Sequence, residues 1–219
     1  MIAADPGTAV VVFAKAPRPG SVKTRLIPLL GAEGAAALQV RLVKHALETA
    51  TKALRPVELH CAPDANDHFF RFCAGHYGVT VRAQVEGDLG ARMLAAFTQS
   101  LTEHACVLLI GSDCPVLAAS HLRQADRALR EGADAVAVPC EDGGYALIGL
   151  RRVDARLFDG IAWSSENVMA ETRERLTGLG WHWRELETLW DIDRPEDYRR
   201  LVASGLLGSG KRSLATGGA

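Results

Sequence analysis

Two apolar runs decide the fold: Thr8-Ala-Val-Val-Val-Phe-Ala14 and Ala105-Cys-Val-Leu-Leu-Ile-Gly111. Both have the length of a strand and contain almost no polar residue, which is typical of strands covered on both faces in parallel sheets. Around them, shorter strand-like segments alternate with segments whose apolar residues recur at helical spacing. This alternation is typical of βαβ crossovers, so we predict an α/β protein with a mainly parallel sheet.

The same patterns give the expected elements along the chain. Strands are expected over residues 8–14, 56–61, 79–84, 105–111, 133–138, 145–150 and 181–186. Helices are expected over residues 33–54, 64–74, 87–103, 118–130, 165–179 and 195–203. A chain of 219 residues fits one domain, expected over residues 8–204. Residues 205–219 are rich in glycine and serine, and we expect a flexible tail there.

Composition and charge exclude several classes of protein. The chain has 25 basic and 26 acidic residues, a balance without the basic excess that marks binding to nucleic acid or an anionic membrane. No apolar run approaches the roughly 18 residues needed to cross a bilayer, and the first residues do not resemble a secretory signal. We therefore expect a cytoplasmic protein without a nucleic-acid or membrane partner. Its oligomeric state is unknown from the sequence.

The five cysteines are odd in number, widely spaced and without a C-x-x-C pair. This spacing indicates neither a zinc site nor a disulfide framework. We expect buried, reduced thiols. Cys114 stands next to an aspartate of interest, but no obvious base is adjacent to it in the sequence, which favours a packed thiol over a nucleophile.

A basic loop follows the first apolar run. Lys15, Arg18, Lys23 and Arg25 place four cations within eleven residues, and Gly20 lets backbone amides approach a ligand closely. Two prolines stiffen this loop, so little entropy is lost when it binds a polyphosphate. The alternative is a solvated surface loop. Because ligands bind at the carboxyl ends of strands in open α/β sheets, the position of the loop favours phosphate binding.

Two aspartates are candidate ligands of a divalent cation. Asp113 follows the second apolar run, in Gly111-Ser-Asp-Cys-Pro115, and Asp193 lies in Asp191-Ile-Asp-Arg-Pro-Glu-Asp197. A magnesium ion that bridges phosphates needs only one or two protein carboxylates. Each aspartate also has a structural interpretation: Asp113 can satisfy the amides of a turn, and Asp193 with Glu196 matches the start of a helix.

The motif Asp142-Gly-Gly-Tyr145 is a third candidate site. Gly143 and Gly144 can form a tight hairpin turn, or they can clear space for a sugar or another acceptor beside Tyr145. Trp163 can add a second aromatic edge to such an acceptor site. Asp142 is then a candidate for orienting the acceptor or for accepting its proton.

Together these motifs resemble one protein family. The segments that carry the resemblance are Phe13–Leu26, Gly87-Asp-Leu-Gly-Ala-Arg-Met93, Gly111–Pro115, Asp142–Tyr145 and Asp191–Asp197. In this order they resemble the DUF2064 group of bacterial glycosyltransferase-like proteins, which is associated with radical-enzyme and arsenosugar gene neighbourhoods. The group belongs to the nucleotide-diphospho-sugar transferase superfamily, and the likeness spans about Val10 to Leu201.

The resemblance implies a three-layer α/β/α sandwich of the GT-A-like type, with a nucleotide diphosphate over the first loop. It implies a divalent ion at Asp113, held in part by the aspartate that matches the Asp-Thr-Pro-Glu-Asp segment of related cytidylyltransferases. That residue is Asp193 here, and Arg194 replaces the threonine. Arg92 adds a further expected phosphate contact.

Our hypothesis from the sequence is a transferase that depends on Mg²⁺ or Mn²⁺ and uses a nucleotide-activated sugar and a small-molecule acceptor. Lys23 and Arg25, with Arg18, would neutralise the diphosphate and stabilise the leaving group. Two alternatives stay open: a nucleotidyltransferase, for example guanylyltransferase-like, that acts on a phosphorylated small molecule, and a nucleotide-binding module without catalytic activity.

Overall fold

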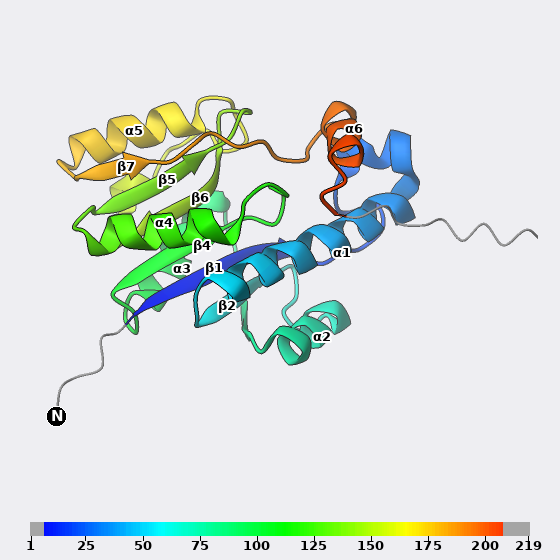
Figure 1. Cartoon of the computed structure of the whole chain (residues 1–219), viewed down its shortest axis with the longest axis horizontal. Helices are drawn as coiled ribbons and strands as arrows, with labels where there is room; N and C mark the ends of the chain where they lie inside the picture. Colours follow the sequence, from blue (N-terminus) through cyan, green and yellow to red (C-terminus); the bar gives the residue numbers. More distant parts are fainter. Residues whose placement is uncertain (1–6, 208–219) are drawn as a thin grey trace, which may run out of the picture.

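The computed structural model describes residues 7–207 and shows a seven-stranded sheet between two layers of helices (Figure 1). The strands are β1 (Thr8–Lys15), β2 (Val57–Ala62), β3 (Thr80–Ala83), β4 (Cys106–Ile110), β5 (Ala135–Pro139), β6 (Tyr145–Leu150) and β7 (Trp183–Glu185). The α-helices are α1 (Ile27–Ala53), α2 (His68–Tyr77), α3 (Leu89–Ser100), α4 (Ala119–Arg130), α5 (Val168–Gly178) and α6 (Pro195–Ser204), with short 3₁₀ turns η1 (Thr24–Leu26) and η2 (Ala155–Leu157).

The strand order is β3-β2-β1-β4-β6-β5-β7. All pairs are parallel except those of β6, which runs antiparallel to both β4 and β5. The two apolar runs that predicted the fold are adjacent central strands, with Val10 opposite Leu108. Full burial of both strands follows from helices on both faces, and the predicted mainly parallel α/β sandwich is confirmed.

Alternate residues of β1 point into two separate hydrophobic cores. Val10 and Val12 face the larger core, which α1, α2 and α4 cover, whereas Val11 and Phe13 face the core under α3, η2 and α5. A third, smaller cluster joins Leu26 and α1 to α6 and to the segment before it (Figure 1). This cluster fixes the return of the chain after β7 next to the loop that follows β1.

The helix that was predicted to begin at residue 33 begins earlier, at Ile27. A first turn from Ile27 precedes Gly31, whose φ of 72° breaks the helical conformation before the regular part begins. By length and composition alone, the segment of helix α1 is also long and apolar enough to span a membrane. The search of the sequence for an uninterrupted apolar run did not find it, because polar residues interrupt the helix. It packs through Leu42, Val43 and Leu47 into the core, as a helix of the domain interior does.

The five cysteines are buried and free, as the sequence predicted. The predicted tail lies, from residue 208 on, outside the described residues.

One buried carboxylate stabilises the edge of the sheet. Glu58 on β2 is only 3% exposed, and it accepts hydrogen bonds from Ser100 Oγ and Arg82 Nε, both at 3.0 Å. Its Oε2 also lies 2.9 Å from His60 Nε2. Burial alone would raise the pKa of Glu58, but the bonds to His60 and Ser100 and the charge of Arg82 outweigh burial and lower that pKa to about 2.

We predict that Glu58→Gln lowers the free energy of unfolding by about 3 kcal/mol near neutral pH, because it breaks a buried charged network. The pKa of Glu58 is lower in the folded state, so its stabilisation is present above about pH 4.5 and is lost as the pH falls towards about 2. Urea denaturation of both proteins at several pH values measures the difference, which should shrink across this window.

Glu103→Gln is the matched control, because Glu103 also faces Arg82, at 3.8 Å, but is exposed. It should change stability by less than about 1 kcal/mol. Equal losses for the two substitutions would contradict the assignment of the stabilisation to the buried network.

Candidate functional site

The candidate site lies at the carboxyl edge of the sheet, where ligands of open α/β sheets bind. Four segments meet there: residues 16–23 after β1, residues 111–118 after β4, residues 140–144 between β5 and β6, and residues 189–193 after β7. Backbone contacts tie the last segment to the others. Leu189 bridges Cys140, and the amide of Ile192 donates to the carbonyl of Asp113 at 2.9 Å.

A pocket of about 280 Å³ opens beside the loop after β1. Its lining residues are Lys15, Ala16, Arg18, Ser21, Val22, Ala62, Pro63 and Arg92. Three of the predicted phosphate-binding cations therefore share one pocket, although Arg92 comes from α3, Lys15 from the end of β1 and Arg18 from the loop that follows. The sequence alone did not show that they meet.

The cations of this pocket differ in their partners. The guanidinium of Arg18 is bound to Asp67 Oδ2 at 3.1 Å, and Asp67 also caps α2. Among the described residues, Arg92 donates to two neutral oxygens, the carbonyl of Gly87 and Oε1 of Gln84. Within residues 7–207, no ion pair or hydrogen bond engages the ammonium of Lys15. In the described part of the chain, the charges of Lys15 and Arg92 are thus not neutralised by a carboxylate, which suits an anion.

Lys23 points away from this pocket, into an acidic centre. Its backbone has φ 48° and ψ 41°, the left-handed conformation, and its side chain is only 6% exposed. The ammonium Nζ lies 3.0 Å from Asp113 Oδ1 and donates to the carbonyl of Ile192. The predicted meeting of the Lys23 loop with Asp113 is present, while the roles of both residues stay predictions.

Arg25 forms a second ion pair across the site, with Asp193 Oδ2. A helix does begin here, as the pattern around Asp193 predicted, but the N-cap position is Arg194, and it is the side chain of Asp197, in the first turn of α6, that binds the amides at the helix start. Asp197 Oδ2 accepts from the amides of Asp193, at 3.1 Å, and of Arg194, at 2.7 Å. The carboxylate of Asp193 is therefore available to Arg25 or to a cation.

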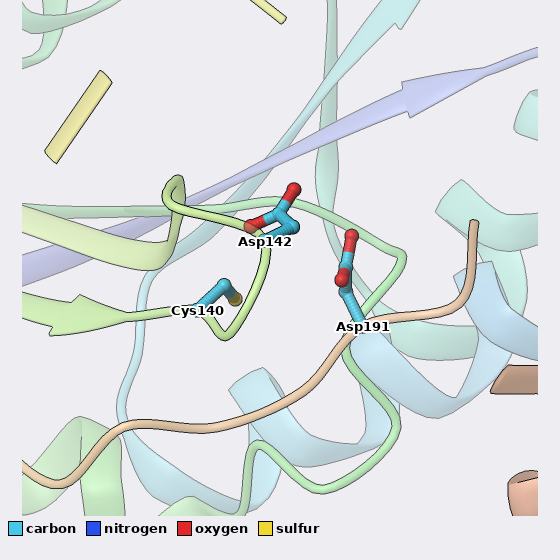
Figure 2. Close-up of side chains that lie close together, drawn as sticks. All are labelled: Cys140, Asp142 and Asp191. Carbon is cyan, nitrogen blue, oxygen red and sulfur yellow. The ribbon is translucent and has the colours of Figure 1, made fainter. Parts of the chain in front are cut away.

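The sequence analysis missed one acidic residue of the centre. Asp191 lies with Cys140 and Asp142 in a cluster whose ligand atoms are all within 4.8 Å of one another (Figure 2). Burial, followed by the charges of Asp142 and Asp113, raises the pKa of Asp191 to about 7, and Lys23 opposes this shift. The spacing Asp191-x-Asp193 was a signal for it, since residues two apart in an extended segment point to the same side, and Asp191 could therefore accompany Asp193 to the site.

The thiols of the site are structural. Cys114 donates to the carbonyl of Trp190 at 3.2 Å and is buried, as expected of a packed thiol. A hydrogen bond with Cys114, together with burial, raises the pKa of the Cys140 thiol. The raised pKa argues against Cys140 as a nucleophile, because nucleophilic cysteines have a lowered pKa.

The glycine pair of the Asp142 motif is explained by close packing. Gly143 has φ 89°, and a Cβ on it would lie 2.0 Å from the carbonyl oxygen of Glu166. Gly144 donates its amide to Asp142 Oδ1 at 2.9 Å, which fixes the exposed carboxylate at the tip of the turn. The turn thus docks on the start of α5 and presents Asp142 to the acidic centre.

The two predicted acceptor-binding aromatics pack against α3. The hydroxyl of Tyr145 contacts Met93 Sδ at 3.6 Å, and burial raises the pKa of Tyr145. The indole of Trp163 packs so closely on Gly90 that a Cβ there would lie 2.6 Å from Nε1. Within residues 7–207 this buried Nε1 has no hydrogen-bond partner. Their role towards an acceptor stays a prediction.

We predict that Gly143→Ala destabilises the chain by several kcal/mol, on the order of 3, because backbone strain adds to a collision with Glu166. Gly132→Ala is the control, because Gly132 also has a positive φ, 110°, but no atom lies within 4 Å of its added Cβ. It should lose only about 1–2 kcal/mol. Chemical denaturation measures both, and equal losses would show that the close approach does not matter.

Comparisons with known proteins agree with this architecture. A family model described as "Uncharacterized protein conserved in bacteria (DUF2064)" matches residues 43–165, more than half of the chain. The matched segment contains Asp113 and the Asp142 motif, and it excludes the loop after β1 and the Asp191 segment. No curated protein matches the chain.

Solved structures share the fold. One from Desulfovibrio desulfuricans G20, provisionally named a nucleotide-diphospho-sugar transferase, is 28% identical with a TM-score of 0.84 and covers 96% of this chain and 90% of that one. The 4-diphosphocytidyl-2C-methyl-D-erythritol synthase of Anaerococcus prevotii is 11% identical, with a TM-score of 0.61 over 90% and 95% of the two chains. Glucosyl-3-phosphoglycerate synthase of Mycobacterium tuberculosis, in complex with Mn²⁺, UDP and glucosyl-3-phosphoglycerate, is 11% identical, with a TM-score of 0.53 over 92% and 77%.

Proposed function

The chain belongs to the DUF2064 family, and from that premise we propose that it is a glycosyltransferase that depends on a divalent metal and uses a nucleotide-activated sugar. One observation carries the proposal. Cations of the loop after β1 face carboxylates from distant parts of the chain, next to a pocket of unneutralised positive charge. A diphosphate with a divalent ion is the ligand whose charges match both halves of this arrangement.

The cationic half would hold the diphosphate of the donor. Lys15 and Arg92 line the pocket without a carboxylate partner among the described residues, and Arg18 is bound there only to Asp67 at the surface. Gly20 and the stiff loop leave the backbone of residues 16–22 close to the pocket. Lys23 follows directly on Val22 of the pocket lining, and together with Arg25 it would reach the phosphates of a bound donor.

The acidic half fits a hard divalent cation. Asp113 is half exposed, Asp142 is exposed, and Asp191 lies close enough to feel the charge of both. Carboxylate oxygens are the ligands that Mg²⁺ and Mn²⁺ prefer, and we assign the cation to Asp113 and Asp191. A bound Mg²⁺ or Mn²⁺ would neutralise phosphate charge as the leaving group departs. The solved neighbour with Mn²⁺ and UDP supports such a cation.

The transfer itself would proceed between the two halves. The hydroxyl of a small-molecule acceptor attacks the anomeric carbon of the sugar as the bond to the diphosphate oxygen breaks. Asp142, at the tip of its turn, accepts the proton of that hydroxyl, and the nucleoside diphosphate leaves with its charge held by Lys23 and Arg25. The nucleotidyltransferases among the solved neighbours share the fold, so product analysis must separate the two reactions.

The test begins with a thermal-shift screen of nucleoside diphosphates, nucleoside triphosphates and their sugar conjugates, each with and without Mn²⁺. The donor that binds best is then incubated with a panel of small-molecule acceptors. We expect release of the free nucleoside diphosphate. Release of pyrophosphate from a triphosphate would show a nucleotidyltransferase, and tight binding without turnover would show a binding module; either result would contradict the proposal.

We predict that Lys15→Ala and Arg92→Ala each weaken binding of the donor about tenfold or more, because each removes a charge-assisted contact with phosphate. Isothermal titration calorimetry measures the change. Lys52→Ala is the matched control, because Lys52 is an exposed lysine at the far end of α1. Unchanged donor binding in both pocket variants would place the phosphates elsewhere.

Removal of the metal gives a further prediction. A chelator should abolish turnover, and added Mn²⁺ or Mg²⁺ should restore it. Asp191→Asn should weaken Mn²⁺ binding at least tenfold, and more than Asp193→Asn, because Asp191 lies beside Asp142 whereas Asp193 is bound to Arg25. The reverse order would favour the aspartate chosen from the sequence, and full turnover in chelator would exclude a metal-dependent reaction.

A further inference from the structure

We propose that Lys23 is the built-in counter-cation of the acidic centre, and that it leaves Asp113 for the diphosphate when donor and divalent ion bind together. The inference rests on the proposed function and deepens it. The exchange explains how Lys23 serves both the cationic and the acidic half of the site. It also predicts that the nucleotide donor and the divalent ion bind cooperatively.

The environment of Lys23 is that of a structural cation. Its side chain is only 6% exposed, and its ammonium is held by Asp113 Oδ1 at 3.0 Å and by the carbonyl of Ile192. A buried ammonium is tolerated only where such oxygens replace its lost water. The carbonyl of Asp113 in turn accepts the amide of Ile192, so Lys23 links three segments of chain at one point.

The backbone directs the side chain towards the acidic centre. Lys23 adopts a left-handed conformation, which costs a non-glycine residue about 1–2 kcal/mol. Ser21 and Val22, immediately before it, line the cationic pocket, and Val22 is buried. The Lys23 side chain therefore starts at the boundary between the pocket and the acidic centre, within reach of either. Strain of this kind is found where a residue is held for function.

The acidic centre has more negative charge than Lys23 can neutralise. Asp142 and Asp191 lie in one cluster, and the charges of Asp142 and Asp113 act on Asp191 in spite of the nearby ammonium. Asp113 is the carboxylate that Lys23 engages, yet half of its side-chain surface stays exposed. A divalent ion can approach from that open side, but in the free protein it must compete with the ammonium for Asp113.

Binding of the two ligands is therefore coupled. A divalent ion alone has to displace the ammonium from Asp113, and the ammonium then has no partner. A diphosphate alone faces carboxylates that repel it. When both are present, Lys23 exchanges Asp113 for phosphate oxygens and no buried charge is left unpaired. By linkage, each ligand must tighten the binding of the other by the same factor, which we expect to be about tenfold or more.

Substitution of Lys23 tests the exchange directly. Mn²⁺ is titrated into the nucleotide-free protein, and the bound fraction is followed by electron paramagnetic resonance. We expect Lys23→Met to bind Mn²⁺ alone about tenfold more tightly than the parent, because the competitor at Asp113 is gone. Lys23→Arg keeps the charge and should bind Mn²⁺ as weakly as the parent. Far-UV circular dichroism confirms that each variant is folded.

Two further variants separate competition from general electrostatics. Lys15→Met removes a nearby positive charge that does not contact Asp113, and it should leave Mn²⁺ affinity nearly unchanged. In an Asp113→Asn background, Lys23→Met should no longer raise Mn²⁺ affinity, since the competition acts at that carboxylate. A gain in Lys15→Met equal to that in Lys23→Met, or no gain in either, would overturn the proposal.

The same proteins distinguish this inference from the proposed function. Titration with UDP and GDP, with and without Mn²⁺, should show coupling in the parent and little in Lys23→Met. If a donor binds and reacts but Lys23→Met leaves Mn²⁺ affinity unchanged, the exchange is wrong and the glycosyltransferase proposal stands. If Lys23→Met raises Mn²⁺ affinity but no nucleotide binds, the counter-cation assignment stands and the proposed function fails.

Discussion

The candidate site depends on one ion pair, between the buried ammonium of Lys23 after β1 and the half-exposed carboxylate of Asp113 after β4. Parallel strands bring their carboxyl ends to one edge of the sheet, but they do not decide which way the following loops turn. The ammonium of Lys23 does so, because it also binds the carbonyl of Ile192 and thereby draws in the segment after β7. Charges from the beginning, middle and end of the chain are thus gathered in one place.

The fold was largely predictable from the sequence because it is governed by local patterns. The two apolar runs placed all four ends of β1 and β4 to within one residue. The continuous burial of β1, whose alternate residues face two different cores, explains why helices must cover both faces of the sheet. The errors occurred where backbone conformation departs from the pattern. The first turn of α1 was missed because Gly31 separates it from the regular helix.

The residues of the candidate site could be predicted only where they lie in a conspicuous local sequence motif. Lys23, Asp113 and Asp142 each lie in a conspicuous loop, whereas Asp191 was overlooked because its neighbours are about fifty or more residues away in the chain. Packing also explains features that resembled ligand-binding signals. Gly143 is required by the carbonyl of Glu166, and Asp197 rather than Asp193 caps the last helix. Such explanations need the tertiary structure.

The most direct measurement is a crystal structure of the chain with Mn²⁺ and a nucleoside diphosphate. Our account predicts the diphosphate between Lys15 and Arg92, the ion on Asp113 and Asp191, and the ammonium of Lys23 on phosphate oxygens. A nucleotide bound at another edge of the sheet, or an ion remote from Asp113 with the Lys23–Asp113 pair intact, would contradict it.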